Sequence, residues 1–336
     1  MPLPFILGAL AIGAGAVGVK KGIDAHEKNN QAKRIYNNAR SMHEKSKNNL
    51  EKARKLTNNS LENFGKLKLD VMSNNINRFI RAFSQIHNIE LSTSRGIEEL
   101  KHLNISKEEL EEMKRMVDFS LEMSSGIAQG SVAGGLAALG AYGGAMTFGV
   151  ASTGTAITGL AGAAATNATL AFLGGGSLAA GGFGMAGGMA VLGGLVAGPA
   201  LAILGFTMNS KAEENLEEAR TQYAEVKKVC EKIEVIIDRC NGITERTDIF
   251  TDLLKKLNVL FGKIIYQLEG VILNSGKDYR YYSNDEKNIV GISMALAKAV
   301  KSVIDTSILT KDGDVDGNTI TVLNENQKLL NSMGVE

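Results

Sequence analysis

Three aspartates near the C-terminus have the spacing of a calcium-binding loop. Asp312, Asp314 and Asp316, followed by Gly317, match the first half of the pattern D-x-D-x-D-G, in which alternate side chains coordinate one cation. The twelfth position of such a loop should supply a bidentate carboxylate, but here it is Leu323. A weak calcium site is therefore one interpretation. The sequence favours the other, a polar turn in which Asp and Gly serve the backbone geometry.

A second pattern resembles a dinucleotide-binding loop. Gly182, Gly184 and Gly187 satisfy G-x-G-x-x-G, which in nucleotide-binding proteins follows a strand and needs an acidic residue about 20 positions further on. The next acidic residue here is Glu213. In a segment so rich in glycine the spacing arises from composition alone, and we expect no nucleotide cofactor.

No other residues form a catalytic set. The histidines are scattered without metal spacing, and no Ser or Cys lies in a nucleophile motif. They are His26, His43, His87 and His102. A formal net charge of +1 provides no broad basic field for nucleic acid. The sequence therefore predicts a protein that is not an enzyme, has no cofactor and does not bind nucleic acid.

The two cysteines, Cys230 and Cys240, lie on one expected helix. Ten residues of helix separate them by roughly 15 Å, whereas a disulfide needs Cα atoms within about 7 Å. Both occupy apolar heptad positions, which predicts buried, reduced thiols and is compatible with cytosolic synthesis. An intermolecular bridge or a reactive thiol is the alternative.

The most unusual feature of the chain is an 88-residue block, from Met123 to Ser210, without Asp, Glu, Lys, Arg or His. It contains 23 of the 38 glycines. Charged residues make up 22% of the chain, and all of them lie outside this charge-free block. Such composition suits an apolar medium or close helix contacts.

Small residues recur four positions apart in the charge-free block, which allows helix backbones to approach closely, as in membranes. Two segments, 126–151 and 185–208, are long enough to span a bilayer. The residues predicted to insert are Gly126, Gly130, Gly134, Gly140, Gly144, Gly184, Gly188, Gly194, Gly198, Leu192, Leu195, Leu201 and Phe206.

Glycine and alanine dilute the large apolar residues of the charge-free block, so its insertion should be marginal. Marginal insertion suits a protein that is soluble first and enters a bilayer later. The alternative is a Gly/Ala-rich cluster of helices that stays packed inside a soluble bundle.

The first 19 residues are also uncharged and precede Lys20 and Lys21. A run of about 17 apolar residues is the lower limit for spanning a bilayer, so membrane contact is one expectation for this segment and internal packing is another. A cleaved signal is disfavoured because the lysines follow the apolar run instead of preceding it.

Apolar residues recur at heptad spacing on both sides of the charge-free block. Residues 24–90 predict one long helix or two nearly collinear ones, and residues 211–275 predict a second arm of similar length. The clearest seam in the second arm consists of Leu216, Tyr223, Val226, Cys230, Ile233 and Ile237. Ser106 with Glu109, and Ser283 with Glu286, have capping-box spacing and predict two further helix starts.

These patterns predict an all-α protein. We expect an elongated bundle of long antiparallel helices that resemble a coiled coil, with an apolar head of Gly/Ala-rich helices at one end. The expected regions are an apolar segment 1–22, a charged arm 23–122, the charge-free region 123–210, a second arm 211–275, and a C-terminal helix and turn 276–336.

This layout resembles the helical pore-forming toxins of the cytolysin A, haemolysin BL and non-haemolytic enterotoxin group. The resemblance lies in architecture: long helices flank an apolar element, here residues 123–210. It implies a helical bundle whose apolar hairpin or tongue inserts after oligomerisation. The run from Leu173 to Ala202 also looks like Gly/Ala blocks of uncharacterised bacterial proteins.

The sequence thus predicts a helical protein that converts from a soluble to a membrane-bound form and forms pores or perturbs the bilayer. Its expected partners are a lipid bilayer and further copies of itself or related helical subunits. We expect a cytoplasmic protein that associates conditionally with membrane, rather than a secreted one. The alternative is a soluble helical scaffold whose Gly/Ala block packs internally or docks a partner.

Overall fold

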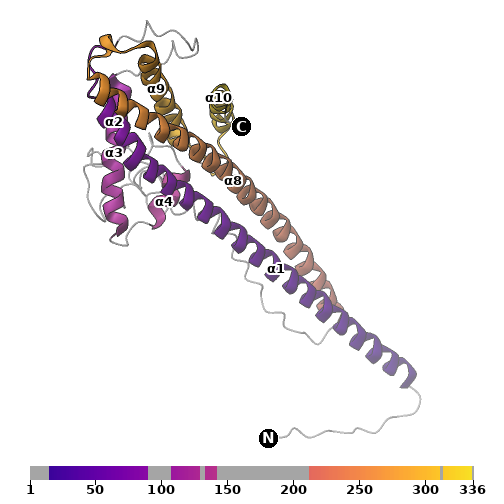
Figure 1. Ribbon diagram of the computed structural model, residues 1–336. Coiled ribbons are helices and arrows are strands. Elements are labelled where there is room, and N and C mark those ends of the chain that lie inside the picture. The colour runs from indigo at the N-terminus through magenta and orange to yellow at the C-terminus, as the bar shows by residue number, and fades with distance from the viewer. Residues whose placement is uncertain (1–14, 90–106, 129–132, 142–211, 311–312, 335–336) are drawn as a thin grey trace. The chain divides into compact units, whose positions relative to one another are not determined.

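The protein is all-α, as the sequence predicts. The structure, a computed structural model, describes residues 15–89, 107–128, 133–141, 212–310 and 313–334 (Figure 1). Within these residues all regular secondary structure is helical. The β-type pairing there consists of two isolated bridges, His87 with Asp278 and Leu309 with Val315.

Long helices dominate the chain. The elements in order are α1 (Gly15–Val71), the π-helical turn η1 (Met72–Ile76), α2 (Asn77–Phe83), α3 (Lys107–Ala128), α4 (Ala133–Ala141), α8 (Ala212–Ser275), the 3-10 turn η6 (Tyr279–Tyr281), α9 (Asn284–Asp305) and α10 (Asn318–Ser332). Helical structure is continuous from Gly15 to Phe83, which confirms the first predicted long helix, and α8 closely matches the predicted second arm.

Contacts divide the chain into two compact units. The first comprises Met1–Lys52 and Pro199–Asp238, and the second comprises Ala53–Gly198 and Arg239–Glu336. Each unit therefore combines segments that the sequence assigned to separate regions. The predicted boundary at residue 122 also falls inside α3.

In the first unit, α1 and α8 run in the same direction. Lys28 binds Glu213 at 2.7 Å, and further along both helices Ala39 packs with Val226 and Cys230. Sequence numbers rise together along the two helices, so the pair is parallel. The predicted antiparallel pairing is wrong.

The same direction holds in the second unit. The Thr57 hydroxyl donates to the Cys240 carbonyl oxygen at 2.9 Å, and Arg78 binds Glu269 at 2.7 Å. Heptad spacing predicts that two helices pair, but it does not indicate whether they run parallel or antiparallel. Polar contacts such as these distinguish the two orientations.

The predicted seam of α8 is largely buried in the first unit. Leu216, Val226, Cys230 and Ile233 are buried and Ile237 is half-buried. Tyr223 is 38% exposed, so its side chain is the least covered of these six. Two of the α1 residues that face this seam are alanines: the set is Ala32, Ile35, Ala39 and Met42. Small partners allow a close approach of the helices but bury little apolar area.

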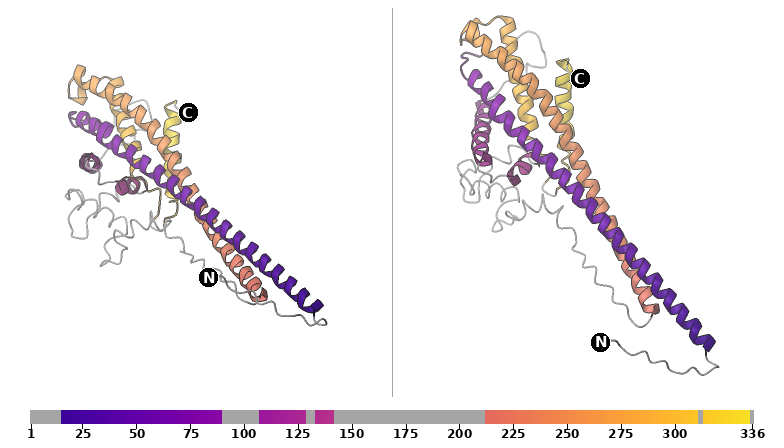
Figure 2. Two further views of the ribbon diagram at one scale, coloured as in Figure 1. Left: turned by 90° about the horizontal axis from the view of Figure 1, so that it is seen from below. Right: turned by 60° about the horizontal axis from the view of Figure 1, so that its bottom comes forward.

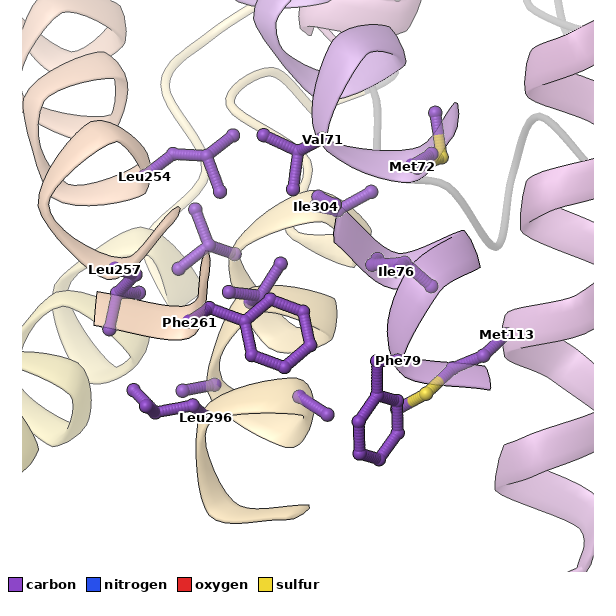
Figure 3. Close-up of a cluster of buried hydrophobic side chains, with 14 of the residues drawn as sticks. Val71, Met72, Ile76, Phe79, Met113, Leu254, Leu257, Phe261, Leu296 and Ile304 are labelled. Carbon is purple, nitrogen blue, oxygen red and sulfur yellow. The ribbon is translucent and has the colours of Figure 1, made fainter. Parts of the chain in front are cut away.

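The main hydrophobic core lies in the second unit. Figure 3 shows side chains from α1, η1, α2, α3, α8 and α9 converging on one cluster. At its centre the rings of Phe79 and Phe261 lie 5.6 Å apart, and Met113 of α3 packs beside Phe79 (Figure 3). In both views of Figure 2, α3 lies beside the end of the first long helix, in agreement with its contacts to η1 and α2. Residues of α4 belong to the same cluster, so this core holds α4 against the neighbouring helices.

Helix α9 begins with the predicted capping box. The Glu286 amide donates to the Ser283 hydroxyl at 3.3 Å, and the Ser283 amide donates to the Glu286 carboxylate at 2.7 Å. Helix α3 is described from Lys107, and Ser106, the other predicted capping residue, lies outside the described part of the chain. Two amides at the start of α9 that lack helical partners are thereby satisfied.

Removal of the Ser283 hydroxyl should destabilise α9 measurably. We expect Ser283→Ala to lower the free energy of unfolding by about 1 kcal/mol, because one helix-start amide loses its acceptor. Ser283→Thr keeps the hydroxyl and should change little. Urea unfolding followed by circular dichroism measures both variants, and equal midpoints for the two would contradict a capping role.

The C-terminal segment departs from the sequence-based interpretation. Beyond the single C-terminal helix that the sequence predicts, the residues after the turn form a second helix, α10, which begins after Gly317. The run of Thr, Ile and Val there favours a strand by local preference, but Thr319, Asn326 and Leu330 are buried at spacings close to helical turns. Tertiary packing therefore overrides the local preference.

Candidate functional site

One helix of the charge-free block, α4, is described, and it is packed into the core of the second unit. Its residues Leu136, Ala137, Leu139 and Ala141 are buried within the main hydrophobic cluster. The helix has nine residues and no charged group. The place where α4 meets α1 and α9 is therefore the point at which the charge-free block is held by the charged part of the chain, and we call it the α4 anchor.

Two glycines bring α1 and α4 into backbone contact. A Cβ atom added to Gly65 would lie 1.9 Å from the Leu136 carbonyl oxygen, and one added to Gly140 would lie 1.9 Å from the Leu61 carbonyl oxygen. Neither position can hold a side chain unless a backbone moves, since real Cβ atoms do not approach that closely. Glycine is needed at both positions because the two helices cross backbone to backbone.

A buried lysine lies beside this crossing. Lys68 of α1 is fully buried, and its Nζ atom donates to the Leu139 carbonyl oxygen at 3.1 Å and lies 3.5 Å from the Thr306 carbonyl oxygen. Nζ also lies 4.6 Å from the centre of the Phe64 ring. The two carbonyls belong to the C-terminal ends of α4 and α9, where partial negative charge accumulates. The Lys68 amine therefore links both helix ends to α1 through its N–H groups.

The last carbonyl of α4 has partners of its own. The amides of Ile308 and Leu309 donate to the Ala141 carbonyl oxygen at 2.8 Å and 3.0 Å. Carbonyls at a helix end have no partner within the helix and must be satisfied elsewhere when buried. The segment after α9 therefore caps the C-terminal end of α4. Helix α4 is thus hydrogen-bonded both to this segment and to Lys68 of α1.

Asp305 interacts electrostatically with Lys68 and belongs to a group of charged side chains from α9 and α3. Lys301 of α9 binds Asp305 at 2.5 Å and Glu112 of α3 at 3.0 Å. Burial lowers the pKa of Lys68 to about 7, although the Asp305 carboxylate acts in the opposite direction. Burial likewise raises the pKa of Asp305. Burial disfavours charge on Lys301 too, but its two carboxylate partners outweigh this and raise its pKa.

This chemistry favours a structural role for Lys68. An amine with a pKa near 7 can act as a nucleophile, but the Lys68 side chain is sealed from solvent and its protons are directed at carbonyl oxygens. The chemical change available at the α4 anchor is the gain or loss of a proton by Lys68 inside the core. A proton gained by Lys68 puts an ammonium in an apolar setting, which is unfavourable without full compensation.

Most residues predicted to insert into a membrane lie outside the described part of the chain. Gly126 lies in α3, and Gly134 and Gly140 lie in α4. The others lie outside it: Gly130, Gly144, Gly184, Gly188, Gly194, Gly198, Leu192, Leu195, Leu201 and Phe206. Gly140, proposed for a lipid-phase helix contact, makes its close contact with α1 instead. Among the helices that the structure describes, none is both long enough and apolar enough to cross a bilayer.

The aspartates with calcium-loop spacing serve other purposes where they are described. Asp314 lies 3.4 Å from Arg239, and Asp316 accepts a hydrogen bond from the Asn318 amide at 2.9 Å at the start of α10. Asp312 lies outside the described residues. The described range contains no cluster of His, Cys, Asp or Glu suited to a metal. These contacts support the interpretation as a polar turn.

Both cysteines are free and buried, as predicted. Burial raises the pKa of the Cys240 thiol, the opposite of what a reactive cysteine requires.

Sequence reasoning missed Gly65 and Lys68. A signal was available for the lysine, because Phe64 and Lys68 of α1 and Met72 of η1 are spaced by four residues along one apolar face. A cation at a core position of a heptad indicates a buried partner. Gly65 had no comparable signal, since its counterpart Gly140 is distant in sequence and only the fold brings them together.

Comparison with known proteins provides no family assignment: no protein-family model, curated protein or solved structure matches the chain significantly.

Proposed function

We propose that this protein is a non-enzymatic helical protein that converts from a soluble form to one inserted in a membrane. The inserting part is the charge-free block, 123–210, and the membrane is perturbed or permeabilised by several copies acting together. The observation that carries the proposal is the 88-residue block without a charged side chain, whose described helix α4 is held at a small, specific contact.

The nature of the α4 anchor supports a reversible association. Helix α4 contributes only small side chains and two leucines, so its burial provides modest hydrophobic stabilisation. Its position depends on the glycine crossing and on a buried lysine, both of which are sensitive to small changes. With nine residues, α4 is also shorter than the roughly 20 residues that span a bilayer. Insertion therefore requires α4 to leave the core and extend with neighbouring sequence.

A soluble scaffold is the second candidate. The burial of α4 within the main cluster favours it, because this helix is already satisfied inside the protein. A scaffold should remain bound to its own core in the presence of lipid, and the amides of residues 133–141 should then stay protected from hydrogen exchange.

Dye release from liposomes separates the two candidates. We expect the wild-type chain to release entrapped dye slowly, and Gly65→Ala to release it several-fold faster, because the variant loosens α4. Gly242→Ala is the matched control, since a Cβ atom there meets nothing within 4 Å. Absence of release by all three proteins, with residues 133–141 still protected, would exclude membrane insertion and favour the scaffold.

A further inference from the structure

We propose that two ion pairs between α3 and α9 form an autoinhibitory clamp, which keeps the charge-free block folded against the core and away from the membrane. The pairs are Glu109 with Lys298 and Glu112 with Lys301, and we call them the α9 clamp. This proposal rests on the proposed function, because it names the contact that restrains insertion.

The α9 clamp joins two carboxylates of α3 to two amines of α9. The Lys298 Nζ atom lies 3.2 Å from a Glu109 carboxylate oxygen, and the Lys301 Nζ atom lies 3.0 Å from a Glu112 carboxylate oxygen. The two glutamates are three residues apart, and so are the two lysines, which places each set on one face of its helix. Helix α3 is therefore held to α9 at two neighbouring points.

The lysines are the more buried partners in the α9 clamp. The side chains of Lys298 and Lys301 are 20% and 18% exposed, whereas those of Glu109 and Glu112 are 36% and 49% exposed. An ammonium group that is largely removed from water needs a carboxylate beside it. Departure of α3 takes one carboxylate from each lysine, so the charges of α9 favour the position in which α3 is docked.

The chain directly after α9 also restrains α4. Helix α9 ends at Asp305, and the amides of Ile308 and Leu309 donate to the carbonyl oxygen of Ala141, the last residue of α4. Helix α9 and the segment that follows it thus contact the chain at α3, in which the charge-free block begins, and again at α4 within the block. Both helices are therefore bonded to one part of the protein.

Membrane insertion requires α3 and α4 to leave these positions together. The segment 126–151, which is long enough to span a bilayer, contains the end of α3 and all of α4. A single membrane helix over this range would continue from α3 without a break. Met113, Met116 and Val117 hold α3 in the core through apolar contacts. The α9 clamp adds a contact that depends on charge, so a change of charge can loosen α3 without the loss of an apolar side chain.

Charge reversal with rescue tests the α9 clamp in the full-length protein. In Glu109→Lys the new amine repels Lys298, so we expect the amides of residues 107–128 to exchange with solvent roughly three- to tenfold faster. Dye release from liposomes of phosphatidylcholine and phosphatidylserine should rise by a similar factor. Glu109→Lys with Lys298→Glu restores an ion pair of reversed polarity, and both rates should return nearly to the wild-type values.

Glu111→Lys is the matched control, because it makes the same change of charge in the same helix. Glu111 binds Lys114 of α3 itself at 2.8 Å, and its side chain is 58% exposed. Both rates should stay at the wild-type level in this variant. Circular dichroism should show that every variant keeps its helical content.

The outcomes separate this proposal from the proposed function. If Glu109→Lys exchanges and releases dye no faster than Glu111→Lys, or if Lys298→Glu fails to rescue it, the α9 clamp is overturned while membrane insertion stands. Faster exchange with dye release at the wild-type rate would overturn the inhibitory role. Faster exchange that the double variant reverses, without dye release by any of the proteins, would support the α9 clamp as the contact that holds α3 and count against insertion.

Discussion

Gly65→Ala is expected to lower the free energy of unfolding by about 2–3 kcal/mol, although alanine is the better helix former. In an unobstructed helix the change from glycine to alanine stabilises by roughly 0.5–1 kcal/mol. Here the new methyl group would lie 1.9 Å from the Leu136 carbonyl oxygen, so α1 and α4 must separate. That separation disturbs the packing of Leu136 and Leu139 and outweighs the gain in helix propensity.

The control for this prediction is Gly242→Ala in α8, where a Cβ atom has open space around it. It should raise the free energy of unfolding, so the two substitutions are expected to have opposite signs. Urea unfolding measures both. A stabilised Gly65→Ala protein would mean that α4 does not cross α1 at this glycine.

Lys68 should make stability rise with pH in the alkaline range. In the unfolded chain a lysine amine keeps its proton up to about pH 10.5, whereas in the folded protein the pKa of Lys68 is about 7. Between these values the unfolded state binds more protons, so the free energy of unfolding increases as pH rises, by up to 1.4 kcal/mol per pH unit. We expect the wild type to gain roughly 2–3 kcal/mol between pH 7.5 and 9.5 relative to Lys68→Met.

The neighbouring charges act differently across this range. Lys301 has a raised pKa, so its stabilising contribution is fully present below pH 10.5 and stays constant between pH 7.5 and 9.5. Asp305 has a pKa raised from 3.8, so its contribution falls as pH increases from there. Glu112 faces Lys301 and is common to both proteins. Urea midpoints at several pH values measure the difference, and parallel curves for wild type and Lys68→Met would contradict a buried, neutral Lys68 at alkaline pH.

The same titration bears on the proposed conversion. Acidification below pH 7 places a full charge on Lys68 inside the core, which weakens the α4 anchor. A fall in pH at a membrane surface therefore acts in the direction that releases α4.

The sequence predicted where individual helices lie more reliably than how the helices pack against one another. The capping pair of Ser283 and Glu286 correctly predicted where α9 begins, because such signals act within one turn. The direction of pairing was wrong because apolar periodicity is the same for parallel and antiparallel helices. The ion pair of Lys28 and Glu213 indicates the parallel direction, but these residues are 185 positions apart and their pairing is seen only in the folded structure.

The candidate site was harder to predict than the fold. Gly140 was predicted to allow a close contact between helices, and it does so, but the contact is with the Leu61 backbone of α1 rather than with another helix of the charge-free block. Lys68 was overlooked among many lysines. Its role depends on burial, which in turn depends on helix ends contributed by α4 and α9.

The parallel pairing of α1 and α8 also has a consequence for synthesis. Lys28 and its partner Glu213 are separated by 185 residues, which a ribosome takes roughly 10–40 s to translate at 5–20 residues per second. For most of that interval α1 has already been synthesised, with its seam uncovered, while the charge-free block is being added. The nascent chain therefore exposes this seam and the charge-free block before the helix that covers the seam exists, and a chaperone that binds the chain in that interval should raise the yield of folded protein.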